Sequence, residues 1–369
     1  MPNEFCAAAI TPDYIRGISP YIPSAPDPVL MERYGVTRLH RLNNNENPLG
    51  PEPSAKALLD EYKMGRASIY PSGDSYFLKH ALAEQFDMAP DQFLVGNGSN
   101  EAIACIVKAF CRQGDNIVTA DRTYSTYEWI AEFSGIEPRL VPLDREYRFD
   151  LSAMLKAADE NTKIFFICNP NNPTNTWHTE EELCSFIEAA GNRIVVIDEA
   201  YCEFVENPDF PDAMKLIKRF PNVIVFRTFS KMYGLAALRV GYLCGSAECI
   251  DMARRAYVVY SVNALGQAAA VSAVKNGAAH IAATRALVRE TGPYVLGRMK
   301  DMGLETVSGP AFFFMAKMPC PDTLVYQRLM KRGVMVRTMT GFRFPNWIRV
   351  TFSTKEVMKD FADALEAVL

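Results

Sequence analysis

The chain has 369 residues, of which 49% are apolar and 22% charged, and its formal net charge is −4. A chain of this length and composition buries a substantial core, which predicts a globular protein with one large and one smaller domain. The negative charge argues against nucleic-acid partners, because neutralising phosphates requires clustered Lys and Arg.

The sequence also argues against membrane and secreted classes of protein. No apolar run approaches the roughly 20 residues that a membrane span requires, and the first residues lack the basic and apolar regions of a signal peptide. The nine cysteines show neither CxxC spacing nor histidine partners. This usage is typical of the reducing cytoplasm and predicts no structural metal site.

The first third of the chain changes character near residue 93. Residues 1–45 are rich in Pro, Asn and Tyr, which predicts an irregular arm, and amphipathic helices are expected over 53–64 and 73–86. Short apolar segments then alternate with helical ones. Strands are expected at 116–120, 138–143, 163–168, 193–200, 222–229 and 239–245, and helices at 101–110, 125–133, 180–190 and 210–220.

This alternation predicts an α/β fold with a mostly parallel sheet that helices cover on both faces. A helical region over 264–301 leads to a last unit, which reads as a smaller α+β domain. Its strands are expected at 311–318, 333–339 and 347–352, and its helices at 320–333 and 355–369. The expected division is an arm over 1–45 that joins the small domain and covers the site, a large domain over 46–265 and a small domain over 266–369.

Polar clusters follow several strands, where the chemistry of such sheets is placed. In "VGNGSNEAI", two glycines permit a tight turn before Ser99 and Asn100 open a helix whose free N–H groups suit a phosphate. A plain N-cap is the alternative interpretation. In "CNPNNPTN", the amide of Asn172 could donate to a phenolic oxygen of a ligand, although the stretch could also be a well-capped loop.

The stretch "RIVVIDEAYCEF" places Asp198 at the end of an apolar strand, and a carboxylate there is costly unless a cation or donors satisfy it. Asp198 could pair with a protonated ring nitrogen of a cofactor, and Tyr201 could donate to an oxygen on the same ring. A structural salt bridge would satisfy Asp198 equally well.

The stretch "RTFSKMYGLAALRVGY" places Lys231 just after another apolar strand. A desolvated lysine near other cations has a lowered pKa and attacks carbonyls. Arg239 offers the planar fork that suits a phosphate, and Thr228 and Ser230 add hydroxyl groups. A solvated loop is the competing interpretation.

Taken together, these clusters match one cofactor, pyridoxal phosphate. Its aldehyde carbon fits Lys231, its pyridinium nitrogen fits Asp198, and its ring oxygen fits Asn172 and Tyr201. Tyr124 could stack on the ring, although a core tyrosine is equally compatible with the sequence. The phosphate fits five donors: Ser99, Asn100, Thr228, Ser230 and Arg239.

The same stretches resemble the pyridoxal-phosphate-dependent aminotransferases of fold type I, most of all the histidinol-phosphate aminotransferases. "RLNNNENPLGP", "SIYPSGDSYFLKHALAE", "GNGSNEAI", "PNNPT", "DEAYCEF", "RTFSKMYGLAALRVGY" and "GVMVRTM…WIRVTF" occur in that family's order. The resemblance implies that Lys231 moves the substrate proton and that Arg349 and Arg337 bind the substrate's anionic group. It also implies that Tyr21 closes over the substrate, and that Tyr70 reaches the other site of a homodimer.

Five positions depart from that family's pattern, and they question the substrate more than the reaction type. Phe312, Tyr260 and Trp347 make an aromatic substrate plausible. Asn175 stands where glycine is usual and Arg122 where proline is usual; Val259 and Ser261 replace a frequent Pro and Asn, and Phe312 stands in place of a frequent Asn.

The leading hypothesis is an aminotransferase that exchanges an amino group between histidinol phosphate, or an aromatic amino acid, and 2-oxoglutarate. The partners are then a small-molecule amino donor and a 2-oxo acid or aldehyde acceptor. A second hypothesis keeps the cofactor but breaks another bond, as in decarboxylases or lyases similar to threonine-phosphate decarboxylase. A third is a non-catalytic module that binds the cofactor, which a DNA-binding extension would have favoured.

Overall fold

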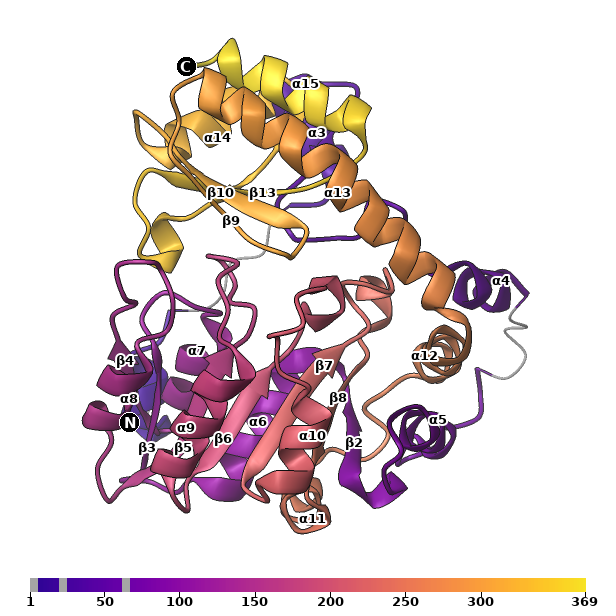
Figure 1. Ribbon diagram of the computed structural model, residues 1–369, viewed down its shortest axis with the longest axis vertical. Coiled ribbons are helices and arrows are strands. Elements are labelled where there is room, and N and C mark those ends of the chain that lie inside the picture. Colours follow the sequence, from indigo (N-terminus) through magenta and orange to yellow (C-terminus); the bar gives the residue numbers. More distant parts are fainter. Residues whose placement is uncertain (1–5, 20–24, 62–66) are drawn as a thin grey trace, which may run out of the picture.

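A computed structural model describes residues 6–19, 25–61 and 67–369. Figure 1 shows a lower unit built on a seven-stranded sheet and an upper unit built on a four-stranded sheet. The helix α13 (Ala278–Asp301) runs diagonally from the upper unit toward the lower one. Within the described ranges, none of the helices combines the length and apolar character that a membrane crossing requires.

The large sheet has the strand order β2-β8-β7-β6-β5-β3-β4. The neighbours from β4 to β7 pair in parallel, whereas β8 runs antiparallel to both β7 and β2, so the prediction of a mostly parallel sheet is confirmed. The strands span Phe93–Gly96 (β2), Asn116–Ala120 (β3), Glu137–Val141 (β4), Thr162–Cys168 (β5), Ile194–Asp198 (β6), Val223–Thr228 (β7) and Gly241–Gly245 (β8).

Continuous apolar runs in β5 and β6 reflect burial of both faces of the sheet. One layer of helices comprises α6 (Gly98–Phe110), α7 (Thr126–Phe133) and α11 (Ala247–Arg255), and the other comprises α8 (Leu151–Ala157), α9 (Glu180–Ala190) and α10 (Ala213–Arg219). A third group packs beside β2 and comprises α4 (Pro53–Glu61), α5 (Tyr76–Phe86) and α12 (Ala264–Asn276).

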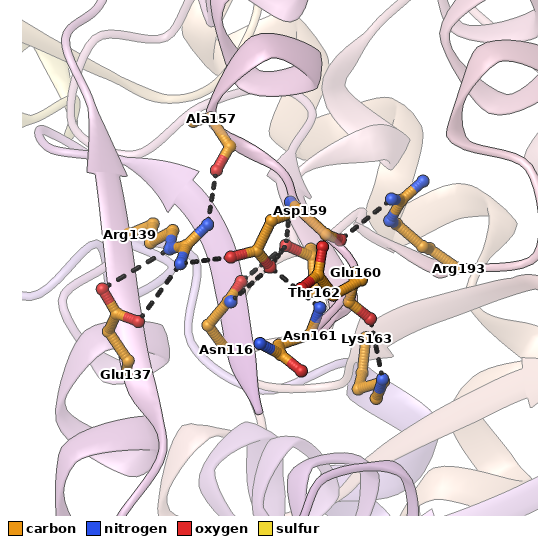
Figure 2. A network of polar contacts seen from close by, with 10 residues as sticks. All are labelled: Asn116, Glu137, Arg139, Ala157, Asp159, Glu160, Asn161, Thr162, Lys163 and Arg193. Atoms are coloured by element: carbon orange, nitrogen blue, oxygen red, sulfur yellow. Dashed lines mark hydrogen bonds and ion pairs between the residues drawn. The ribbon is translucent and has the colours of Figure 1, made fainter. Parts of the chain in front are cut away.

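A polar network ties together the amino ends of β3, β4 and β5 (Figure 2). Asp159, in the turn before β5, accepts hydrogen bonds from Asn116 Nδ2 at 2.9 Å and Arg139 Nη2 at 2.6 Å. These partners hold the pKa of Asp159 below its usual range, with the Asn116 hydrogen bond as the largest favourable cause. The network therefore fixes the edge of the sheet opposite the carboxyl ends of these strands.

The upper unit has the strand order β12-β13-β10-β9, with every neighbouring pair antiparallel. The strand expected over 333–339 is instead two short strands with different partners. β11 (Val334–Met335) pairs with β1 (His40–Arg41), and β12 (Arg337–Thr338) pairs with β13 (Trp347–Thr351). The remaining elements are β9 (Thr306–Ser308), β10 (Phe313–Lys317), α14 (Asp322–Met330) and α15 (Lys355–Glu366).

The expectation of an irregular arm over 1–45 is wrong. The described part contains α1 (Ala7–Ile10), α2 (Asp13–Arg16), α3 (Asp27–Tyr34) and β1. Leu30 of α3 packs on Met330 and Met335 of the upper unit, whereas α2 lies against α7 of the lower one. The end of α3 carries a recognisable signal, because Gly35 follows it with φ of 67°, a conformation that glycine adopts without strain.

Candidate active site

A cavity of about 500 Å³ opens between the carboxyl ends of the central strands and the upper unit. It is lined mostly by residues that the sequence analysis singled out, although they come from distant parts of the chain. These are Ser99, Tyr124, Asn172, Asp198, Tyr201, Thr228, Ser230, Lys231, Arg239, Arg337 and Arg349. Their proximity agrees with the expectation that strand ends converge at one edge of the sheet.

Asp198 is the last residue of β6, and its side chain is almost wholly buried. Its Oδ2 accepts a hydrogen bond of 2.5 Å from the Tyr127 hydroxyl, and its Oδ1 accepts one of 3.0 Å from the Ala200 N–H. Burial raises the pKa of Asp198 to about 6, against the lowering effect of these donors and of Lys231. No Lys, Arg or His in the described ranges forms an ion pair with Asp198, which disfavours the salt-bridge alternative.

Lys231 follows β7, and its Nζ donates a hydrogen bond of 2.9 Å to the Asn44 carbonyl. Loss of water around the amine lowers the pKa of Lys231 to about 7, and the nearby guanidinium groups of Arg349 and Arg239 lower it further. A substantial share of the amine is therefore neutral near pH 7, and the neutral amine is the form that attacks carbonyl carbons. The structure thus has the desolvated, cation-flanked lysine that the sequence predicts.

A set of donors at the start of α6 forms a cradle for an anion. Gly98 has φ of 75°, a conformation that favours glycine, and a Cβ there would displace the end of the Arg239 side chain. The N-cap Asn97 makes no side-chain capping bond, which leaves the first N–H groups of α6 to a ligand. Ser99, Thr228 and Ser230 line the same part of the cavity.

Arg349, on β13 of the upper unit, is buried and lines the same cavity. Its Nη1 donates to Asn172 Oδ1 and its Nη2 donates to the Asn43 carbonyl at 2.7 Å, while its Nε has no partner. Burial lowers the pKa of Arg349 to about 10. Since Oδ1 of Asn172 is engaged, the N–H groups of that amide remain to donate to a ligand.

Tyr201 lies close to this pair, with its ring against Phe313 at a centroid distance of 5.1 Å. Asn45 Nδ2 donates to the Tyr201 hydroxyl oxygen at 3.0 Å, and burial raises the pKa of Tyr201. The phenol therefore stays protonated at neutral pH and can donate to a ring oxygen.

Two of the residues proposed from the sequence, Asn100 and Tyr70, do not line the cavity. Asn100 is exposed, and its Oδ1 accepts a hydrogen bond of 3.1 Å from the Tyr124 hydroxyl. Tyr70 is 81% exposed and stacks on Tyr260 with a centroid distance of 4.9 Å. Tyr21 lies outside the described residues.

The prediction of an aromatic substrate from Phe312, Tyr260 and Trp347 finds no support in the lining of the cavity. Phe312 is fully buried and stacks on Phe204 at 4.5 Å, so core packing accounts for its size. Trp347 is buried beside Phe344. None of the three lines the cavity.

Other departures have local partners. Ser261 donates a hydrogen bond of 2.7 Å to Glu101, and the Arg122 guanidinium lies 4.9 Å from the centre of the Phe344 ring. Val259 is exposed beside Tyr260.

Sequence reasoning missed residues that act through long-range contacts. Tyr127, on α7, was overlooked, although it lies only three residues after Tyr124 and its hydroxyl donates to Asp198. In the sequence analysis, the run from Asn43 to Asn47 contributes only to the family resemblance, and none of its residues is given a role. Its backbone and side chains in fact contact Arg349, Lys231, Tyr201 and the Met232 carbonyl.

The donor set fits the cofactor expected from the sequence. Anion donors lie at one side of the cavity, and Asp198 is a buried carboxylate that forms no ion pair with the described residues. An amine with a lowered pKa lines the same space. Among the residues that the structure describes, no group of three His, Cys, Asp or Glu side chains could hold a metal ion.

A mixed seven-stranded sheet under a small antiparallel unit, with this lysine and aspartate at the strand ends, defines a fold type I transferase. The chain belongs to the aminotransferase class I and II family, whose model matches residues 37–365. It is therefore an aminotransferase.

Curated relatives support this assignment over nearly the whole chain. A histidinol-phosphate aminotransferase from Anaeromyxobacter sp. is 34% identical over 98% of this chain and 99% of its own length. One from Symbiobacterium thermophilum is 37% identical over 96% of this chain and 97% of its own length. The crystal structure of histidinol-phosphate aminotransferase from Sinorhizobium meliloti in complex with pyridoxal-5'-phosphate superposes with a TM-score of 0.86 at 26% identity, covering 98% and 97% of the two chains.

Proposed function

We propose that this aminotransferase, which uses pyridoxal 5'-phosphate, transfers an amino group between histidinol phosphate and 2-oxoglutarate. The observation that carries the proposal is a lysine amine with a pKa of about 7 in a cavity that combines anion donors with Asp198. The relatives named above are histidinol-phosphate aminotransferases, which favours a phosphorylated amino substrate.

Each functional group of the cofactor has a proposed holder. Asp198 would pair with the ring nitrogen, and Asn172 and Tyr201 would donate to the ring oxygen. When bound, pyridoxal phosphate supplies an electron sink for the electrons of the substrate Cα–H bond. The phosphate would be held by Ser99, Thr228, Ser230 and Arg239, with Asn100 beside them.

Lys231 then acts as general base and acid. A neutral amine is required to accept the Cα proton, and the neighbouring Arg349 and Arg239 favour that form. Asp198 must be ionised to stabilise a cationic ring nitrogen, and a cation beside it lowers its pKa from the raised value. Tyr127 and the Ala200 N–H keep its two oxygens aimed at the cavity.

Arg349 and Arg337 are proposed to bind the anionic group of the substrate. Replacing Arg349 with lysine is expected to raise KM for the amino donor about tenfold, because a point charge cannot form the paired contacts of a guanidinium. Steady-state kinetics with histidinol phosphate test this, with Arg255→Lys on the exposed end of α11 as the matched control. An unchanged KM in Arg349→Lys would place the substrate anion elsewhere.

The lowered pKa of Lys231 predicts how the cofactor-depleted protein captures its cofactor. Because only the neutral amine attacks, the capture rate is expected to fall about tenfold for each pH unit below the pKa of Lys231. Above a pH of about 7 the rate should level off. Stopped-flow absorbance on mixing with pyridoxal 5'-phosphate measures this curve. A rate that continues to climb toward the ordinary lysine pKa would contradict the assignment.

We also propose a cytoplasmic homodimer in which Tyr70 reaches the phosphate of the partner's cofactor. An exposed apolar surface supports this, since Tyr70 stacks on Tyr260 beside other large exposed side chains. These are Ile69, Phe77, Val258 and Val259, with exposures of 58% to 74%. A monomeric mass in sedimentation experiments at micromolar concentration would contradict the proposal.

The substrate is tested by following the visible band of the cofactor-loaded enzyme with single amines. Loss of the band with histidinol phosphate and its return with 2-oxoglutarate would support the proposal. Loss with aromatic amino acids instead would reassign the substrate. Carbon dioxide release from O-phosphothreonine without loss of the band would replace transamination by the decarboxylase hypothesis.

A further inference from the structure

Asn175, at the end of the loop that follows β5, uses its whole side chain to bind the upper unit. Its Nδ2 donates to the carbonyls of Ala311 at 2.9 Å and Phe313 at 2.8 Å, and its Oδ1 accepts from the Ala311 N–H at 2.9 Å. Because two carbonyls can only accept and an amide N–H can only donate, the orientation of this amide is unambiguous. The side chain is fully buried.

The backbone of Asn175 also packs closely against the upper unit. The Asn175 carbonyl lies against Gly309, where any Cβ would collide with it. The Asn175 N–H donates to the Asn171 carbonyl at 2.7 Å, which ties the residue back to its own loop. Loop 169–175 and the segment that enters β10 are therefore held in one fixed relation.

The loop and the β10 segment that Asn175 joins both contact Arg349, the proposed substrate-binding residue. Three residues before Asn175, Asn172 accepts a hydrogen bond from Arg349. At the other end, Phe313 lies beneath the Arg349 guanidinium at 5.6 Å and against the Tyr201 ring at 5.1 Å. Arg349 itself sits on β13, which pairs with β10 through the register Met315–Arg349.

We propose that Asn175 is a positioning residue that clips loop 169–175 to β10 and so fixes Arg349 relative to Asn172 and Tyr201. The inference rests on the proposed function, because it takes Arg349 as the group that binds the substrate anion. Glycine is usual at this position in the family pattern that this chain resembles. A glycine keeps the backbone turn but has no side chain for the clip.

The test compares Asn175→Gly with Asn346→Gly in the cofactor-loaded enzyme. Both residues have positive φ, 62° and 67°, so glycine suits both backbones. Asn346 is exposed, and its side chain makes no hydrogen bond to another described residue, so it is the matched control. Asn175→Gly is expected to raise KM for histidinol phosphate about fivefold to tenfold while kcat changes less than about twofold. The control should leave both constants unchanged.

A double-mutant cycle separates positioning from general stabilisation. If Asn175 acts through Arg349, adding Asn175→Gly to Arg349→Lys should raise KM by less than about twofold further. A purely structural role would lower the melting temperature without this KM effect or its coupling to Arg349. If Asn175→Gly cannot be recovered folded, Asn175→Asp carries the same expectation, because it keeps the acceptor for Ala311 and removes both donors.

Two results would overturn the inference but leave the proposed function intact. In the first, Asn175→Gly has the same KM as the control Asn346→Gly. In the second, the effects of Asn175→Gly and Arg349→Lys on KM are fully additive in the double-mutant cycle. An Arg349→Lys variant with unchanged KM would place the substrate anion elsewhere and overturn this inference. A wild-type enzyme that does not transaminate histidinol phosphate would overturn the proposed function and this inference with it. The two failures are therefore distinguishable in one set of measurements.

Discussion

Lys231→Ala is expected to abolish both the visible absorption of the lysine-bound cofactor and transamination. No other lysine lines the described cavity, so no second amine can form the bond to the aldehyde or move the substrate proton. Absorbance spectra and half-reaction rates measure the two losses separately. Lys275→Ala, on the exposed end of α12, is the matched control and should behave as wild type.

Turnover by Lys231→Ala at a normal rate would remove Lys231 from its assigned role. Retention of the visible band with loss of turnover would also be informative, because it would assign the covalent bond to another amine.

Asp198→Asn is expected to lower the rate of transamination by on the order of a thousandfold while the cofactor still binds. A neutral amide cannot balance a cationic ring nitrogen, so the ring becomes a poor acceptor of the Cα–H electrons. The phosphate donors lie elsewhere in the cavity and are unchanged. Rate measurements and cofactor titration on the same preparation distinguish loss of chemistry from loss of binding.

Tyr127→Phe is the control for this prediction, because it removes the hydrogen bond to Asp198 and leaves the charge in place. If the charge of Asp198 matters most, Tyr127→Phe should be much less damaging than Asp198→Asn. Full activity of Asp198→Asn would show that the ring nitrogen is not held there.

The residues at the strand ends could be predicted from the sequence because their signal is local. Asp198 and Thr228 each end an apolar run, and Lys231 follows one of these runs by three residues. In a parallel sheet the carboxyl ends of neighbouring strands share one edge, so a one-dimensional pattern already determines which side chains converge. The resemblance to fold type I aminotransferases adds the roles of residues such as Arg349, which local pattern leaves undefined.

Errors arose where packing partners lie far apart in the chain. Phe312 reads as a candidate for the substrate pocket, but its partner Phe204 places it in the core. Residues 333–339 read as one strand, yet Val334 and Arg337 pair with segments some 300 and 12 residues away respectively. The periodicity of apolar residues predicts that a residue is buried, but it does not predict which distant segment packs against it.

Local patterns in the sequence therefore indicated the fold class and the cofactor, and the family resemblance supplied the reaction type. The tertiary structure alone decided which groups tune the cofactor site. Burial lowers the pKa of Lys231, with Arg349 and Arg239 lowering it further, and burial raises the pKa of Asp198. The clip from Asn175 to β10 likewise joins residues 136 and 138 positions apart. Such effects depend on distance in space and on the loss of water, which sequence separation does not reveal.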